Sequence, residues 1–199
     1  FNDHLRRLSQ GESVSIPRYD FISGTSIKDC TPLTLDERSV LVIEGIHGLN
    51  PRLTPGIPDE CKFRIYISCF TTVAMDNISR IPTTDNRLLR RLIRDYRTRG
   101  SNAVQTLARW PSVRRGEEKH IFPYQENADV MFNSSLFYEI SALRRFAEPI
   151  LREVPDTEAV YSEARRMLKF LDNFIPVDVD EVPPTSVLRE FVGGSSFKY

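Results

Sequence analysis

The chain has 199 residues and a mass of 23.0 kDa, the size of one domain or of one domain with an extension. Hydrophobic residues make up 40% and charged residues 27%, which excludes a wholly disordered chain. The 27 basic and 27 acidic residues cancel, so neither nucleic acid nor a membrane is indicated as a partner by global charge. No apolar run approaches the ~20 residues needed to cross a bilayer.

The cysteines and the first residue bear on where the protein acts. Cys30, Cys61 and Cys69 have no CxxC spacing and cannot all pair, so we expect free thiols and a reducing, cytoplasmic location. The chain starts at Phe1 rather than at a methionine, and we expect it to be a piece of a longer polypeptide.

The first two thirds of the chain alternate between helical and extended patterns. Residues 2–10 read as the end of a helix, and residues 14–26 as an extended or hairpin-like segment. Residues 40–43 are apolar on both faces, which is typical of a buried parallel strand. Residues 63–68 and 128–132 are further strand candidates. With helical stretches between them, the pattern predicts an α/β fold.

Helical periodicity dominates the rest of the sequence. Residues 84–100 predict an amphipathic helix, capped by Thr84 or Asp85 and ended by Gly100. Two apolar stripes within residues 136–175 predict core-packing helices, and a short helix precedes Gly193. We therefore expect a core at residues 1–155 and a helical C-terminal extension at residues 156–199.

Arginine is concentrated in one part of the chain. Residues 80–115 hold ten arginines, no lysine and two aspartates. Within this stretch five arginines share an arc of roughly 120° on the predicted helix, namely Arg87, Arg90, Arg91, Arg94 and Arg97. Guanidinium groups without lysine favour bidentate recognition of phosphate or carboxylate. A solvated face, or pairing with acids elsewhere in the fold, remains the alternative.

Other residues offer weaker signals. Glu44 ends the predicted strand, where a carboxylate suits Mg²⁺, although an ordinary strand-end acid explains it as well. Tyr19 and Phe21 place aromatic rings on the hairpin, either to stack on a base or to pack. Trp110 lies next to Arg109, a combination that also suits single-stranded RNA. The printed sequence contains no GxxxxGK[ST], GxGxxG, HExxH or GxSxG motif.

Several segments resemble one known family. They are Pro17-Arg18-Tyr19-Asp20-Phe21, Val42-Ile43-Glu44-Gly45-Ile46, the run from Arg90 to Gly100, Phe122-Pro123 and Ala128-Asp129-Val130, in this order. The chain resembles the uridine kinase and phosphoribulokinase family. Glu44 to Pro51 and Arg109 to Glu118 resemble, more narrowly, bacterial nucleoside kinases whose full chains carry an N-terminal TGS-type domain.

This resemblance implies a P-loop NTPase-like fold, a three-layer parallel sheet with helices on both faces, incomplete at its N-terminal strands. It implies ATP-dependent phosphorylation of a nucleoside 5′-hydroxyl, with uridine as the first candidate and ATP and Mg²⁺ as cofactors. By position, Arg91, Arg94 and Arg99 match catalytic lid arginines, and Arg91 also substrate binding. Tyr19 and Phe21 match the nucleoside-binding hairpin, and Glu44 the metal site.

The sequence departs from the family at several places. The phosphate loop, the catalytic aspartate and the ribose-binding aspartate would precede this segment, so we expect the isolated chain to be inactive. Gly24 stands where uridine–cytidine kinases have a histidine, and Ser101 where they have a later lid arginine. Two alternatives stay open: a phosphoribulokinase-like sugar kinase, and a non-enzymatic RNA- or anion-binding regulatory module using residues 80–115. Self-association is also left open.

Overall fold

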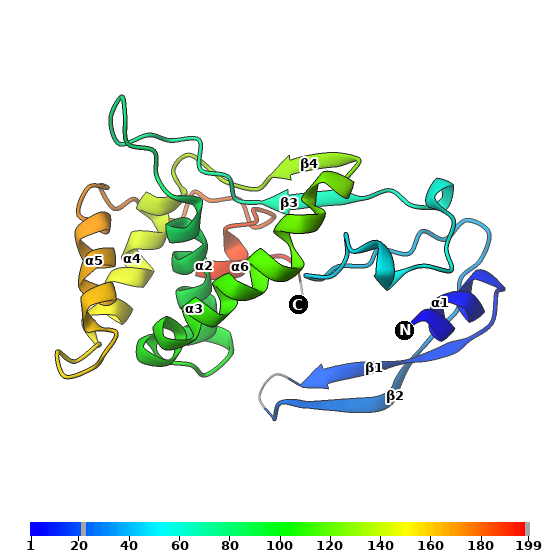
Figure 1. Ribbon diagram of the computed structural model, residues 1–199. Helices are drawn as coiled ribbons and strands as arrows, with labels where there is room; N and C mark the ends of the chain where they lie inside the picture. Colours follow the sequence, from blue (N-terminus) through cyan, green and yellow to red (C-terminus); the bar gives the residue numbers. More distant parts are fainter. Residues whose placement is uncertain (21–22, 198–199) are drawn as a thin grey trace. The chain divides into compact units, whose positions relative to one another are not determined.

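The computed structural model describes residues 1–20 and 23–197, and the chain divides into two compact units (Figure 1). The first unit comprises residues 1–66 and 115–131, and the second comprises residues 67–114 and 132–199. The predicted boundary at residue 155 is a different kind of division, between a family core and an extension, and it stays a prediction. Phe21 lies outside the described residues.

The first unit opens with a helix and a β-hairpin. The helix α1 spans Asn2–Ser9 and buries Leu5 and Leu8, and the chain leaves it through Gly11 at φ +76°. The strands β1 (Val14–Asp20) and β2 (Thr25–Leu33) pair antiparallel. Their register shifts around Pro17, because proline lacks the N–H that a regular ladder needs. The predicted helix end and hairpin are both confirmed.

The described residues also form a small parallel sheet and three short 3-10 helices. The strands β3 (Ile65–Ser68) and β4 (Val130–Asn133) pair side by side (Figure 1). Val130 N donates to Arg64 O at one end and Ser134 N to Ser68 O at the other, a parallel register. The 3-10 helices are η1 (Pro51–Leu53), η2 (Asp59–Cys61) and η3 (Phe122–Asn127). The α/β class is confirmed, and the three-layer sheet stays a prediction.

The predicted strand at residues 40–43 is wrong. The structure has irregular backbone there, and Val40 and Val42 are 86% and 85% exposed. A buried parallel strand needs neighbouring strands for its backbone groups and cover for both faces. Within the described residues no strand pairs with this segment, so its apolar residues remain in solvent.

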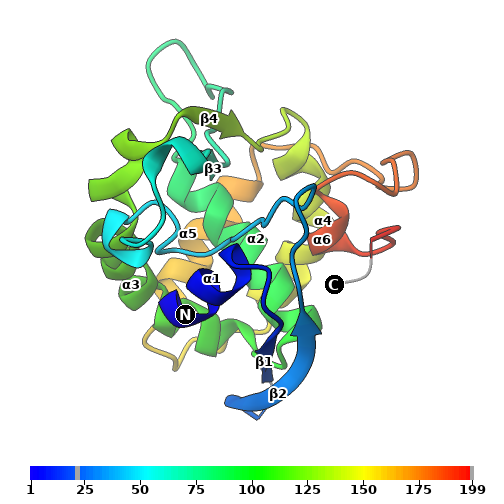
Figure 2. The same cartoon turned by 90° about the vertical axis from the view of Figure 1, so that its right-hand side faces the viewer.

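The second unit is built on helices. They are α2 (Thr83–Thr98), α3 (Ala103–His120, which ends in the first unit), α4 (Glu139–Arg152), α5 (Tyr161–Leu171) and α6 (Arg189–Val192). The helix α4 packs between α2 and α5, and α6 lies against α2 and α4 in both views (Figures 1 and 2). Leu89, Leu143 and Leu171, fully buried, link α2, α4 and α5 in one core.

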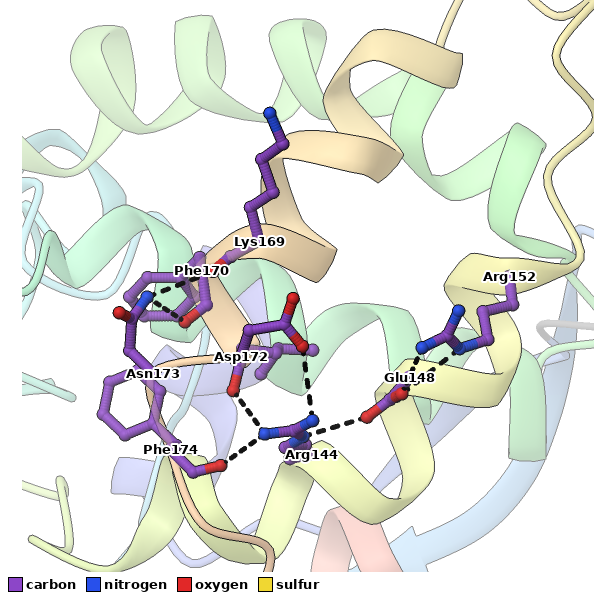
Figure 3. Close-up of polar contacts among 9 residues, drawn as sticks. Arg144, Glu148, Arg152, Lys169, Phe170, Asp172, Asn173 and Phe174 are labelled. Carbon is purple, nitrogen blue, oxygen red and sulfur yellow. Dashed lines mark hydrogen bonds and ion pairs between the residues drawn. The ribbon is translucent and has the colours of Figure 1, made fainter.

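Arg144 on α4 ties the C-terminal end of α5 to the core (Figure 3). Its NH1 donates to Leu171 O at 2.9 Å and to Phe174 O at 2.6 Å, carbonyls near the end of that helix. A cation is favoured there by the helix dipole. Glu148 holds the guanidinium from the other side at 2.9 Å. Arg144 therefore has a structural role, linking α4 to the end of α5.

Two details bear on earlier expectations. Cys61 is an exposed free thiol and Cys69 a buried one. Among the described residues, no helix combines the length and the apolar character that a membrane span requires.

Candidate anion-binding site

The arginine-bearing helix α2 forms as its periodicity predicts. Leu88, Leu89, Leu92 and Ile93 are at most 1% exposed, so the predicted apolar face is the buried face. The helix ends before Gly100 at φ +62°, as expected. The predicted side-chain cap is wrong, because Pro82 occupies the N-cap position.

Asp85, a predicted cap residue, instead forms a partly buried ion pair. Its two carboxylate oxygens accept from NH1 and NH2 of Arg166 on α5, both at 2.8 Å. The paired geometry is the bidentate one that makes arginine–carboxylate contacts strong. The acid in the first turn therefore joins α2 to α5 rather than capping its own helix.

Arg90 on α2 is a structural residue. Its guanidinium pairs with both carboxylate oxygens of Glu139, and NH2 also donates to Ser134 O at 2.8 Å. The side chain of Arg90 is 11% exposed and that of Glu139 is fully buried. Burial by itself would lower the pKa of Arg90, but the hydrogen bond and charge of Glu139 raise it above its ordinary value.

Arg97, in the last turn of α2, also pairs within the protein. Its NH1 donates to the carbonyl of Phe191 on α6. Gly193 follows with φ +91°, and a Cβ atom there would lie 2.4 Å from Arg97 NH2. The glycine thus leaves the space through which the guanidinium reaches the carbonyl. Arg90 and Arg97 therefore pair with groups elsewhere in the fold, as the alternative to anion recognition predicted.

Arg91 and Arg99 gather around one buried acid. Asp95 lies one turn from each, 3.1 Å from Arg91 Nε and 3.1 Å from Arg99 NH1. Thr106 on α3 donates to the same carboxylate at 3.4 Å. Only 3% of the Asp95 side chain is exposed, so one fixed carboxylate is shared by two guanidinium groups.

Arg94 faces the C-terminal helix. Its NH1 donates to Glu190 Oε1 at 2.9 Å, and its guanidinium carbon lies 5.7 Å from the centre of the Phe191 ring. In the part of the chain that the structure describes, Nε of Arg94 and Nε of Arg91 are buried and make no hydrogen bond. The buried Nε of Arg94 therefore lacks a hydrogen-bond partner, which is costly, whereas the Nε of Arg91 keeps its ion pair with Asp95.

Like charges crowd this end of α2. Burial lowers the pKa of Arg91, Asp95 opposes that effect, and the guanidinium groups of Arg99, Arg94 and Arg109 lower it further. We call Arg91, Arg94, Arg99 and Arg109 the arginine cluster. Asp95 and Glu190 are acids that pair with members of this cluster. Several partly desolvated guanidinium groups close together favour a polyvalent anion such as a phosphate chain.

The remaining predicted site residues belong to the first unit. Tyr19 on β1 is 52% exposed, and its hydroxyl lies 3.9 Å from where a Cβ atom of residue 24 would stand. Glu44 lies in an exposed loop. The described residues contain no group of three or more His, Cys, Asp and Glu side chains able to hold a metal ion. Mg²⁺ often takes one or two protein carboxylates and fills its shell with water and substrate phosphates, so Glu44 fits a partial role.

Two members of the site escaped the sequence prediction. Arg109 was counted among the arginines of residues 80–115 but not as a site residue, because it lies on α3 and its spacing from Arg91 gives no helical relation. Glu190 is 96 residues from Arg94 in the sequence, and no periodicity links residues so far apart. The arginines that do turn inward, Arg90 and Arg97, reduce the charge available to a nucleic-acid surface.

Comparison with known proteins places the chain in a family. The sequence model of the family described as "Phosphoribulokinase / Uridine kinase family" matches residues 1–141, well over half of the chain. A uridine kinase of Staphylococcus epidermidis is 27% identical over 129 residues, covering 64% of this chain and 54% of the relative. A uridine kinase of Staphylococcus aureus is 27% identical over 132 residues, covering 65% and 54%. The chain spans about half the length of the curated relatives it matches.

Proposed function

Since this chain belongs to the phosphoribulokinase / uridine kinase family, we propose that it serves ATP-dependent phosphorylation of a nucleoside 5′-hydroxyl, with uridine as the first substrate to test. The observation that carries the proposal is the arginine cluster, in which Arg91 and Arg99 share the buried Asp95 and Arg94 pairs with the partly exposed Glu190. The narrower assignment to the TGS-associated nucleoside kinases rests on the segments from Glu44 to Pro51 and from Arg109 to Glu118.

The cluster suits phosphoryl transfer. The hydroxyl oxygen bonds to the γ-phosphorus as the bond to the bridging oxygen breaks, and negative charge spreads over the phosphoryl oxygens. Arg91, Arg94 and Arg99 would stabilise that charge through terminal N–H groups that remain partly exposed, their side chains being 24%, 28% and 32% accessible. Catalysis of this kind is mostly positioning and charge stabilisation.

Recognition of the nucleoside and of the metal is proposed separately, for residues of the first unit. We propose that Tyr19 and Phe21 contact the base, as their match to the family hairpin implies. Glu44 would supply a carboxylate to Mg²⁺, an ion that neutralises phosphate charge when bound. The absence of a GxxxxGK[ST] motif from these 199 residues supports the further proposal that the chain alone binds MgATP poorly.

A substrate panel tests the proposal. The native polypeptide that carries these residues is assayed for ATP turnover with uridine, other nucleosides, ribulose 5-phosphate and pantothenate. We expect uridine to be preferred. Preference for ribulose 5-phosphate would establish the sugar-kinase alternative, which the family description also covers, and no turnover on any substrate would refute a kinase role.

Matched variants test the arginine cluster in the same assay. Arg91→Gln should lower kcat/KM by about 100- to 1,000-fold, the usual effect of removing one donor to a charged transition state. Arg165→Gln makes the same change of charge at an exposed position of α5 and should leave the rate within about twofold. Equal rates for both variants would remove Arg91 from the mechanism.

A further inference from the structure

The C-terminal helix α6 lies beside α2 in both views (Figures 1 and 2), and it contacts arginines of that helix. The family match ends at residue 141, so this contact lies outside what the family model covers. Two consecutive residues make it: the Glu190 carboxylate accepts from Arg94, and the Phe191 carbonyl accepts from Arg97. Phe191 also lies against the guanidinium groups of Arg90 and Arg94, at 5.1 and 5.7 Å from its ring centre.

The backbone of this segment is fixed by apolar packing. Leu188 is fully buried, and Phe191 and Val192 are 3% and 8% exposed in the same core as α2 and α4. Detaching the helix would expose these three apolar side chains to water, which opposes the change. The segment therefore stays in place while ligands bind.

The Glu190 side chain, unlike the buried residues next to it, is partly exposed to solvent. It is 34% exposed, so its carboxylate is able to turn into solvent without unpacking the helix. Asp95, the other counter-charge of the cluster, is 3% exposed and held by two guanidinium groups and a threonine. Of these two acids, only Glu190 is exchangeable.

We propose that Glu190 is an intramolecular competitor for the anion site: its carboxylate neutralises Arg94 until a phosphate group of a polyphosphate ligand displaces it. The inference rests on the proposed anion-binding role of the arginine cluster. A carboxylate and a phosphate oxygen use the same N–H donors, so both cannot hold the NH1 group of Arg94 together. The ligand must break the Arg94–Glu190 pair, so its binding is weaker by the free energy of that pair. An anion of higher charge therefore competes better for Arg94.

Calorimetric titration of the 199-residue chain with inorganic tripolyphosphate tests this inference. Glu190→Gln should tighten binding by about two- to fivefold, the fold-change that corresponds to a partly exposed ion pair. Glu163→Gln is the matched control, because Glu163 also pairs with one arginine and its side chain is 35% exposed. The control should leave the affinity unchanged. Glu190→Asp, with a shorter reach, should give an intermediate affinity.

A second measurement follows the displacement directly. The side-chain carboxyl carbon of Glu190 should shift on saturation with tripolyphosphate in ¹³C NMR spectra of the unmodified chain, and that of Glu163 should not. A static Glu190 signal, or equal or weaker binding by Glu190→Gln, would overturn the inference and indicate that Glu190 only positions Arg94.

Arg91→Gln separates this inference from the proposed function. If that variant keeps full affinity while Glu190→Gln still binds more tightly, the role of Arg91 falls and the inference about Glu190 stands. If Arg91→Gln loses binding and Glu190→Gln leaves the affinity unchanged, the role of Arg91 stands and the inference about Glu190 falls. If Glu190→Gln binds tripolyphosphate and the native chain does not, the inference is supported. If neither protein binds millimolar tripolyphosphate, the inference about Glu190 is refuted, whereas the proposed function is decided by the turnover assay.

Discussion

Replacing Glu139 with alanine should lower the free energy of unfolding of the second unit. The loss should be larger than for a substitution at an exposed position of the same helix. The substitution leaves the Arg90 guanidinium 11% exposed and without its carboxylate partner. Glu139 also accepts from the backbone N–H of Leu136 at 3.1 Å, so the start of α4 loses a hydrogen bond as well. Breaking a buried pair by removing one partner costs about 3–5 kcal/mol.

That loss corresponds to a fall in Tm of roughly 6–20 °C for a chain of this size. Trp110 is the single tryptophan of the chain and packs against the core of the second unit, so its fluorescence during urea unfolding reports on that unit. Far-UV circular dichroism gives the helix content in the same titration.

Glu148→Ala is the matched control, since it removes the same side chain from the same helix. Glu148 makes only partly exposed pairs with Arg144 and Arg152, worth about 0.2–1 kcal/mol (Figure 3). The double variant Arg90→Met with Glu139→Leu should recover much of the stability lost by Glu139→Ala, because no unpaired charge is left buried. Equal losses for the two alanine variants would refute the assignment of Arg90 to the structural core.

Three further outcomes follow from local geometry. Gly193→Ala should destabilise the second unit by about 2–4 kcal/mol, because its φ of +91° disfavours a side chain and the new Cβ displaces Arg97; unchanged urea unfolding would contradict the clash. With the third cysteine replaced by serine, Cys69 should react with a thiol reagent at pH 8 about tenfold or more slowly than exposed Cys61, since burial raises the pKa of its thiol, and equal rates would argue against that burial. Hydrogen bonds from two neighbouring arginines lower the pKa of Glu148, so its contribution to stability is complete above the ordinary glutamate pKa and is lost as the pH falls through the lower folded value. A ¹³C titration midpoint at or above the ordinary value would contradict this pairing.

The sequence by itself determined the elements that depend on near neighbours. The apolar spacing along α2 and its end before Gly100 are properties of consecutive residues, and so are the hairpin of β1 and β2 and the end of α1 near Gly11. Motif order along the chain likewise identified the family, which the match over residues 1–141 bears out. Such features need no knowledge of what lies across the fold.

Only the tertiary structure decided which arginines of α2 are held in the core and which are partly exposed to a ligand. Arg90 and Arg97 lie on the same helical arc as Arg94, and spacing cannot distinguish them. Their partners, Glu139 and the Phe191 carbonyl, are 49 and 94 residues away and reach α2 through the packing of α4 and α6. The misjudged strand at residues 40–43 has the same cause, because burial depends on neighbouring strands and not on the segment's own hydrophobicity.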